Sequence, residues 1–114
     1  MKIFIVCPVR GLTVEEENLI GDYVRTLELG AEVYCPIWDT DQNDAIGNRI
    51  CEDNRAAIEA ADEVHVWYNP ASQGTLFDVG MAWALRKPLI IINRYDLTLT
   101  PEKSFVNFLL EVGK

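Results

Sequence analysis

The sequence predicts an α/β fold, because short β-branched and aromatic runs alternate with longer segments of helical periodicity along all 114 residues. Strands that alternate with helices pair in parallel, since parallel strands need long right-handed crossovers. The length suits one hydrophobic core, so residues 1–114 are predicted to form a single domain. We therefore expect a Rossmann-like or flavodoxin-like three-layer sandwich, with a parallel sheet of about four strands in the order 2-1-3-4 and helices on both faces.

The chain begins with a strand and a helix. The continuous apolar run KIFIVC, residues 2–7, is typical of a strand that is covered on both faces. The segment 12–30 has apolar residues at helical spacing, and Thr13 and Glu16 form a capping-box pattern at its start. Gly30 is the predicted end of this helix.

A second strand and a second helix follow. The second strand is AEVYCP, residues 31–36, and a polar loop is predicted over residues 37–44. The segment 45–62 is predicted to be a helix. Its inner face would hold Ile46, Ile50, Asn54, Ile58 and Ala61.

The second half continues the alternation. EVHVWY, residues 63–68, is the third predicted strand, and PLIIIN, residues 88–93, is the fourth. Between them a helix is expected from about Thr75. A last helix is predicted from Thr100, which would cap it, with Pro101 in the first helical position.

Composition restricts the partners. The formal net charge is -8 and no cluster of Lys and Arg occurs, which argues against binding to a nucleic acid polymer. No apolar run is long enough to span a membrane. Cys7, Cys35 and Cys51 show neither a CxxC pair nor the spacing of a metal site, so we expect reduced thiols in a cytoplasmic protein without a bound metal. A small molecule is the expected ligand.

The predicted topology places a ligand site beyond the carboxyl ends of the first and third strands, where the winding direction reverses. Arg10 and Gly11 of the PVRG loop would face Ser72, Gly74 and Thr75 of the NPASQGT loop. A helix that starts in this second loop offers free N–H groups and a positive dipole end to an anion. The alternative is an ordinary helix cap.

Asp78 is a carboxylate among small and apolar residues, about one turn into the predicted helix. As a structural residue it would be solvated and favoured by the helix dipole. As a functional residue, in an apolar pocket near Trp67 and Tyr68, it could attack or stabilise a sugar carbon that is losing its base. Gly80 would let the same helix approach a strand or ligand closely.

Asp53 and Asn54 form a second candidate pair. Asn54 falls on the apolar stripe of its helix, where an amide needs a hydrogen-bond partner, so it serves either the site or the core. His65 lies on a predicted central strand and is interpreted as a core residue.

The segment ADEVHVWYNPASQGTLFDVGMAWALRKPLIIIN, residues 61–93, resembles the nucleoside 2-deoxyribosyltransferase superfamily, which includes deoxynucleoside monophosphate N-glycosidases and pyrimidine nucleotide hydrolases. Its shared features are a strand followed by Ser72, Gly74, an acidic residue at 78 and Gly80. CPVRG near the start and NRAAIEAAD in the second helix extend the similarity over most of the chain.

This resemblance implies roles for individual residues. The acidic residue of the family is the nucleophile that takes the deoxyribose C1′, and Asp78 stands in its place. In the nucleotide-cleaving branch a serine and an arginine hold the 5′-phosphate, which implies this role for Ser72 and Arg10. A carboxylate that positions the sugar and base corresponds to Asn54. Members typically pair across this site, so a homo-oligomer is expected.

The sequence departs from the family pattern at two positions. The family nucleophile is normally Glu, so Asp78 is one methylene shorter, and a displacement of about 1 Å can cost on the order of 100-fold in rate. Asn54 replaces a carboxylate and cannot act as an acid or base. These changes fit either a different substrate geometry or a pocket that binds a nucleotide without turnover.

The leading hypothesis is cleavage or transfer at the N-glycosidic bond of a nucleoside or nucleoside 5′-monophosphate, without a cofactor. Asp78 would be the nucleophile, Ser72 and Arg10 the phosphate anchors, and Asp53 and Asn54 contacts to sugar or base. One alternative is a non-catalytic nucleotide-sensing module. Another is cleavage of NAD in the manner of TIR-like domains.

Overall fold

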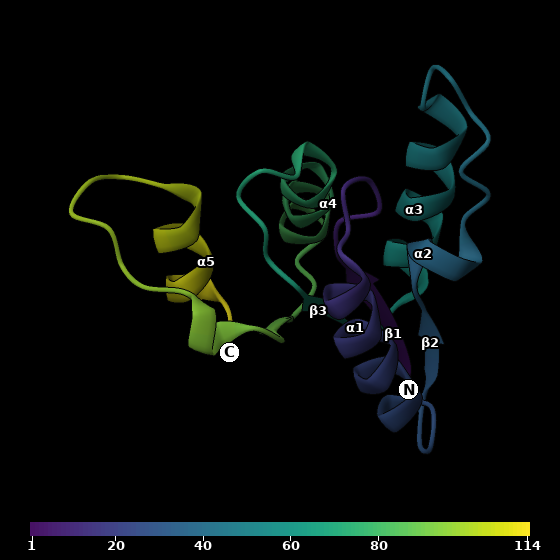
Figure 1. The fold of residues 1–114 in the computed structure, drawn as a ribbon, viewed down its shortest axis with the longest axis horizontal. Helices are drawn as coiled ribbons and strands as arrows, with labels where there is room; N and C mark the ends of the chain where they lie inside the picture. The colour runs from purple at the N-terminus through teal and green to yellow at the C-terminus, as the bar shows by residue number, and fades with distance from the viewer.

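The computed structural model describes residues 1–114 and has a four-stranded parallel sheet at its centre (Figure 1). The strands are β1 (Lys2–Val6), β2 (Glu32–Tyr34), β3 (Glu63–Val66) and β4 (Leu89–Ile91). Their order is β2-β1-β3-β4, and every neighbouring pair is parallel. The predicted fold class and strand order are confirmed.

Five α-helices and one short 3-10 helix connect and follow the strands. They are α1 (Val14–Leu27), α2 (Pro36–Asp39), α3 (Asn48–Ala60), α4 (Gln73–Ala84), η1 (Arg94–Asp96) and α5 (Phe105–Val112). Thr13 and Glu16 form the predicted capping box of α1.

Helices cover both faces of the sheet, because successive side chains of each strand point to opposite sides. Odd-numbered residues of β1, such as Ile5, pack with Ile20 and Val24 of α1. Even-numbered residues, such as Phe4, pack with Ile58 of α3 and with residues of α4 and α5. The expected three-layer arrangement results, with one long helix on one face and three helices on the other (Figure 1).

Two elements in the first half differ from the sequence-based predictions. The helix α1 ends at Leu27 with Glu28 as its C-cap, so Gly30 does not end it in a left-handed conformation. The segment predicted as a loop contains α2, a single helical turn that begins with Pro36 at its first position and has Asp39 at its end. Such a short helix carries no periodicity to detect.

The start of α3 also differs. Ile46 was expected on the inner face, but the helix begins at Asn48, and Ile46 lies outside it with 91% of its surface exposed. Gly47 separates the two, with a φ of 88° that favours glycine. Asn54, Ile58 and Ala61 occupy the buried positions as predicted.

The starts of the last two helices differ as well. The helix α4 begins at Gln73, because Ser72 is the N-cap and its hydroxyl oxygen accepts the Thr75 N–H at 3.2 Å. The helix α5 has Ser104 as its N-cap instead of Thr100. The hydroxyl of Thr100 instead donates to the Glu102 carbonyl within the preceding turn.

None of these helices combines the length and the apolar character that a membrane crossing would require.

Candidate active site

A cavity of about 560 Å³ opens at the carboxyl ends of β1 and β3, where the topology predicted a ligand site. The loop after β1, the β2–α2 region, α3 and the start of α4 contribute to its walls. Its polar and charged lining residues are Arg10, Gln42, Asn54, Ser72, Gln73 and Asp78. The cavity therefore collects hydrogen-bonding groups from segments that are far apart in sequence.

Asp78 is the only carboxylate that lines this cavity, and it is buried, with 7% of its surface exposed. The solvated position considered from the sequence is wrong. Burial raises the pKa of the Asp78 carboxyl from 3.8 to about 7, because a charge is disfavoured away from water, whereas the Asn54 hydrogen bond acts in the opposite direction. Near neutral pH the carboxyl therefore exists in both protonation states.

Asn54 lies on α3 directly across from Asp78. Its amide Nδ2 donates to Asp78 Oδ2 over 3.4 Å, a long hydrogen bond, and both residues are buried. The helices α3 and α4 pack against each other, which holds the two side chains together across the cavity wall. The sequence-based hypothesis that Asn54 serves this site is consistent with its position.

The start of α4 presents free hydrogen-bond donors beside Asp78. The backbone N–H groups of Gln73 and Gly74 precede the first intrahelical hydrogen bond and have no partner in the chain. The Ser72 hydroxyl oxygen accepts from Thr75, so its own proton remains available for donation. These donors, together with the positive end of the helix dipole, favour a phosphate-sized anion.

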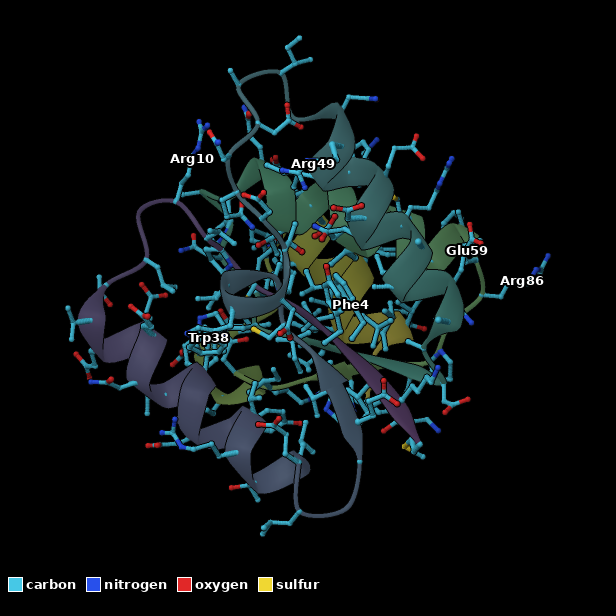
Figure 2. The ribbon with its side chains drawn as sticks, turned by 90° about the vertical axis from the view of Figure 1, so that its right-hand side faces the viewer. Phe4, Arg10, Trp38, Arg49, Glu59 and Arg86 are labelled. Carbon is cyan, nitrogen blue, oxygen red and sulfur yellow. The ribbon has the colours of Figure 1, made fainter.

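Arg10 lines the same cavity from the loop after β1. Its side chain extends from the outer edge of that loop (Figure 2). Gly11, the next residue, has a φ of 69° and makes the turn that carries Arg10, but it does not itself line the cavity. The structure thus joins Arg10 to Ser72 in one site and gives Gly11 a backbone role.

Two other predicted site residues lie away from the cavity. The carboxylate of Asp53 is on the surface of α3, where it pairs with Arg49 at 2.8 Å. The side chain of Thr75 is completely buried on the inner face of α4, and its hydroxyl has no hydrogen-bond partner. Helical geometry explains the first case, because Asp53 points about 100° away from its neighbour Asn54.

The aromatic residues expected near Asp78 line a different hollow. Trp67 and Tyr68 face a second cavity of about 440 Å³ beside α1. Gly80 faces open space, so no close approach requires a glycine there. His65 is buried as expected, between the Tyr23 hydroxyl at 2.6 Å and the Glu63 carboxylate at 2.8 Å.

Cysteine thiols contribute apolar surface to the Asp78 cavity, a role that the sequence did not reveal. Cys7 and Cys51 both line it, and neither forms a disulfide. Burial raises the pKa of Cys51, and the adjacent Cys35 thiol together with burial raises the pKa of Cys7 well above its usual range. Both remain neutral thiols at pH 7, so neither offers a thiolate nucleophile to the cavity.

The β2–α2 corner supplies further residues that sequence reasoning missed. Gln42 lines the cavity, and Thr40 donates to Asn54 Oδ1 at 2.8 Å. A detectable signal was Pro36, since proline after an extended residue often occupies the first position of a helix. No group of three or more His, Cys, Asp or Glu side chains is arranged to hold a metal ion.

Comparison with known proteins identifies the family of the chain. The family model of nucleoside 2-deoxyribosyltransferase matches residues 3–108, and the chain therefore belongs to this family. No curated protein sequence matches the chain. The resemblance noted from the sequence is thereby confirmed.

Two solved structures share the fold. A CMP N-glycosidase from Clostridium botulinum is 20% identical, with a TM-score of 0.67 over 99% of this chain and 83% of that protein. A 2-deoxyribosyltransferase from Bacillus psychrosaccharolyticus is also 20% identical, with a TM-score of 0.64 over 91% of this chain and 77% of the other.

The raised pKa of Asp78 predicts a specific dependence of stability on pH. Between pH 4 and pH 7 the unfolded chain has released this proton and the folded chain retains it, so the free energy of unfolding falls as the pH rises. Relative to an Asp78→Asn variant, the free energy of unfolding of the wild type should fall by on the order of 4 kcal/mol over this range. Above pH 7 the difference between the two proteins should stay constant. Urea denaturation of both proteins from pH 4 to 9 measures the difference. Parallel profiles would contradict the buried, titrating carboxyl.

Proposed function

We propose that the protein catalyses cleavage or transfer at the N-glycosidic bond of a nucleoside or nucleoside 5′-monophosphate, with Asp78 as the nucleophile. The observation that carries this proposal is a buried carboxylate that shares one cavity with an anion-binding helix terminus. Membership of the nucleoside 2-deoxyribosyltransferase family supports the reaction class. The cavity is of a size suited to a small molecule.

In the proposed mechanism the ionised Asp78 attacks C1′ of the sugar. A carbon–oxygen bond forms, the C1′–N bond breaks, and the base leaves with the bonding electron pair and takes up a proton from the solvent. Water or a second base then attacks C1′ and releases the carboxylate. The Asn54 amide can donate to the carboxylate but cannot supply a proton as an acid, so its role here is orientation.

The anion-binding element would fix the substrate. Ser72, the free N–H groups of Gln73 and Gly74, and Arg10 offer neutral and cationic donors to a 5′-phosphate. The phosphate would then hold the sugar near Asp78 on the same helix. The similarity to a CMP N-glycosidase favours a monophosphate as the substrate class.

A second copy of the chain is proposed to cover α4. Phe77 and Trp83 are 54% and 56% exposed on the outer face of this helix, with Gly80 open to solvent between them. A helix that is apolar on its outer as well as its inner face is typical of an interface. Because Phe77 also lines the Asp78 cavity, a partner on this face would close over the site.

The free cysteines support a cytoplasmic location.

The proposed function predicts release of free base. Wild-type protein is incubated with ribo- and deoxyribonucleosides, their 5′-monophosphates and NAD, and the products are separated by chromatography. Base release should fall by at least about 10³-fold in Asp78→Asn, which keeps the shape of the side chain but removes the nucleophile. Intact substrates with a raised melting temperature would show a binding module instead, and release of nicotinamide alone would show NAD cleavage.

The phosphate site predicts a split between substrates. Arg10→Ala should raise KM for a nucleoside 5′-monophosphate by about tenfold, the effect of one lost charged hydrogen bond. The matched control is the corresponding nucleoside, whose KM should not change because it has no phosphate. Equal effects on both substrates in steady-state kinetics would rule out Arg10 as a phosphate anchor.

The proposed interface predicts a change of oligomeric state. Trp83→Glu should shift the protein from dimer or higher oligomer to monomer in sedimentation equilibrium, because a buried charge would lie unpaired in the contact. Leu29→Glu alters another exposed apolar residue, away from α4, and should leave the assembly unchanged. A wild type that sediments as a monomer would disprove the proposal.

A further inference from the structure

The orientation of the Asn54 amide determines whether its NH2 group or its carbonyl oxygen faces the Asp78 carboxyl. With the NH2 group toward Asp78, the amide stabilises an ionised carboxylate, whereas with the carbonyl toward it the amide stabilises a protonated one. An isolated Asn side chain has no intrinsic preference between the two arrangements. Something beyond Asn54 must therefore select the orientation.

The hydrogen bonds behind Asn54 provide that selection. Thr40 Oγ1 donates to Asn54 Oδ1 at 2.8 Å, so the carbonyl side of the amide is occupied. A hydroxyl has one proton, and because Thr40 gives its proton to Asn54, it must accept from Tyr34, whose hydroxyl lies 2.7 Å away. The donors therefore run in one direction from Tyr34 through Thr40 and Asn54 to Asp78.

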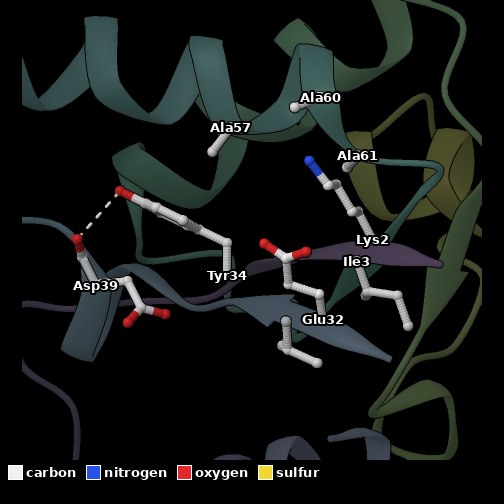
Figure 3. A pocket seen from close by; sticks show the side chains of 9 residues that line it. Lys2, Ile3, Glu32, Tyr34, Asp39, Ala57, Ala60 and Ala61 are labelled. Atoms are coloured by element: carbon white, nitrogen blue, oxygen red, sulfur yellow. Dashed lines mark hydrogen bonds between the residues drawn. The ribbon is translucent and has the colours of Figure 1, made fainter. Parts of the chain in front are cut away.

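Tyr34, at the outer end of this series of hydrogen bonds, packs against the sheet. The Tyr34 ring stacks on Phe4 of β1, with ring centroids 5.5 Å apart and an interplanar angle of 13°. It lies in a groove between β2 and α3, where Figure 3 shows its hydroxyl directed toward the Asp39 carbonyl. That carbonyl is 3.3 Å from the hydroxyl, whereas Thr40 Oγ1 is 2.7 Å away, so the single Tyr34 proton goes to the nearer acceptor, Thr40. Tyr34 thus approaches Thr40 from a fixed position.

Thr40, in the middle of this series of hydrogen bonds, is held in place by the β2–α2 corner. Gln42 Nε2 donates to the carbonyls of Pro36 and Thr40 at 3.0 and 3.2 Å. The Asp39 carboxylate accepts the Cys35 N–H at 2.9 Å and so closes the single turn of α2. The backbone on both sides of Thr40 is therefore tied down, and the buried Thr40 hydroxyl faces α3.

We propose that Tyr34 and Thr40 are positioning residues that hold the Asn54 amide with its NH2 group toward Asp78 and thereby favour the nucleophilic form of the carboxylate. Neither residue is among those that line the Asp78 cavity, so both act through Asn54. The inference deepens the proposed function, since it rests on Asp78 as the nucleophile. It also assigns a purpose to an amide at position 54, where a carboxylate would add a second negative charge beside Asp78.

Charged and titratable groups lie near both Asp78 and Tyr34, the two ends of the hydrogen-bond series. Around Asp78, the cavity contains Cys7 and Cys51 as neutral thiols and Arg10 near its rim. Around Tyr34, the groove contains Lys2, Glu32 and Asp39. Substitution of Thr40 or Tyr34 removes no charge from either set, so any change in Asp78 titration reports the hydrogen-bond chain.

The test follows the Asp78 carboxyl by NMR in protein labelled with 13C-carboxyl aspartate, with the signal assigned from Asp78→Asn. Thr40→Val keeps the shape of the side chain but removes the hydroxyl, and the pKa of Asp78 should rise by about one unit, equivalent to one lost hydrogen bond. Thr40→Ser restores the donor and should return the wild-type titration. Tyr34→Phe should raise the pKa in the same direction by a smaller amount.

Activity gives a second readout. In Thr40→Val the rate of base release should fall about tenfold below pH 6 and remain unchanged above pH 9, where the carboxyl is fully ionised in both proteins. An unmoved Asp78 titration in both Thr40→Val and Tyr34→Phe would overturn the inference, whether or not base is released. A shifted titration without any base release would support the chain of donors and refute the proposed function, so the two failures are distinguishable.

Discussion

The burial of one carboxylate, Asp78, is the constraint on which the site depends. A charge away from water needs polar partners, and the Asn54 amide on α3 is the hydrogen-bond partner of Asp78. The free N–H groups at the start of α4 and the Arg10 loop after β1 line the same cavity. The parallel order β2-β1-β3-β4 brings these segments to one edge of the sheet. Asp78 therefore faces the cavity as a buried carboxyl whose pKa lies near 7.

Asn54 gives Asp78 a hydrogen-bond partner without a second negative charge. A second carboxylate at its position would repel Asp78 and raise the pKa further, whereas an amide with its NH2 group inward stabilises the ionised form. This benefit depends on the amide's orientation, which the Thr40 hydroxyl controls. The Asn54 amide is thus coupled to the β2–α2 corner, and the two belong to one hydrogen-bonded unit.

The sequence predicted the sheet, its order and the long helices, since those elements bury continuous or periodic apolar runs. It also placed Arg10, Ser72 and Asp78 together, because topology alone brings two loops to one edge. It failed where single residues decide the structure: Gly47 excludes Ile46 from α3, and the one-turn helix α2 carries Thr40 into the core. Asp53 and Thr75 were misplaced because neighbours along a helix point in different directions, and no local pattern tells which of them faces a cavity.

Covalent trapping tests the central claim most directly. A nucleoside 5′-monophosphate with fluorine at the 2′ position of an arabino sugar destabilises both positively charged transition states, so the glycosyl-enzyme should accumulate. Intact-mass spectrometry followed by peptide mapping should find one added sugar phosphate on the peptide that contains Asp78, and none in Asp78→Asn. Attachment to Cys7 or Cys51, or release of base from the natural substrate with no adduct on Asp78, would contradict the account.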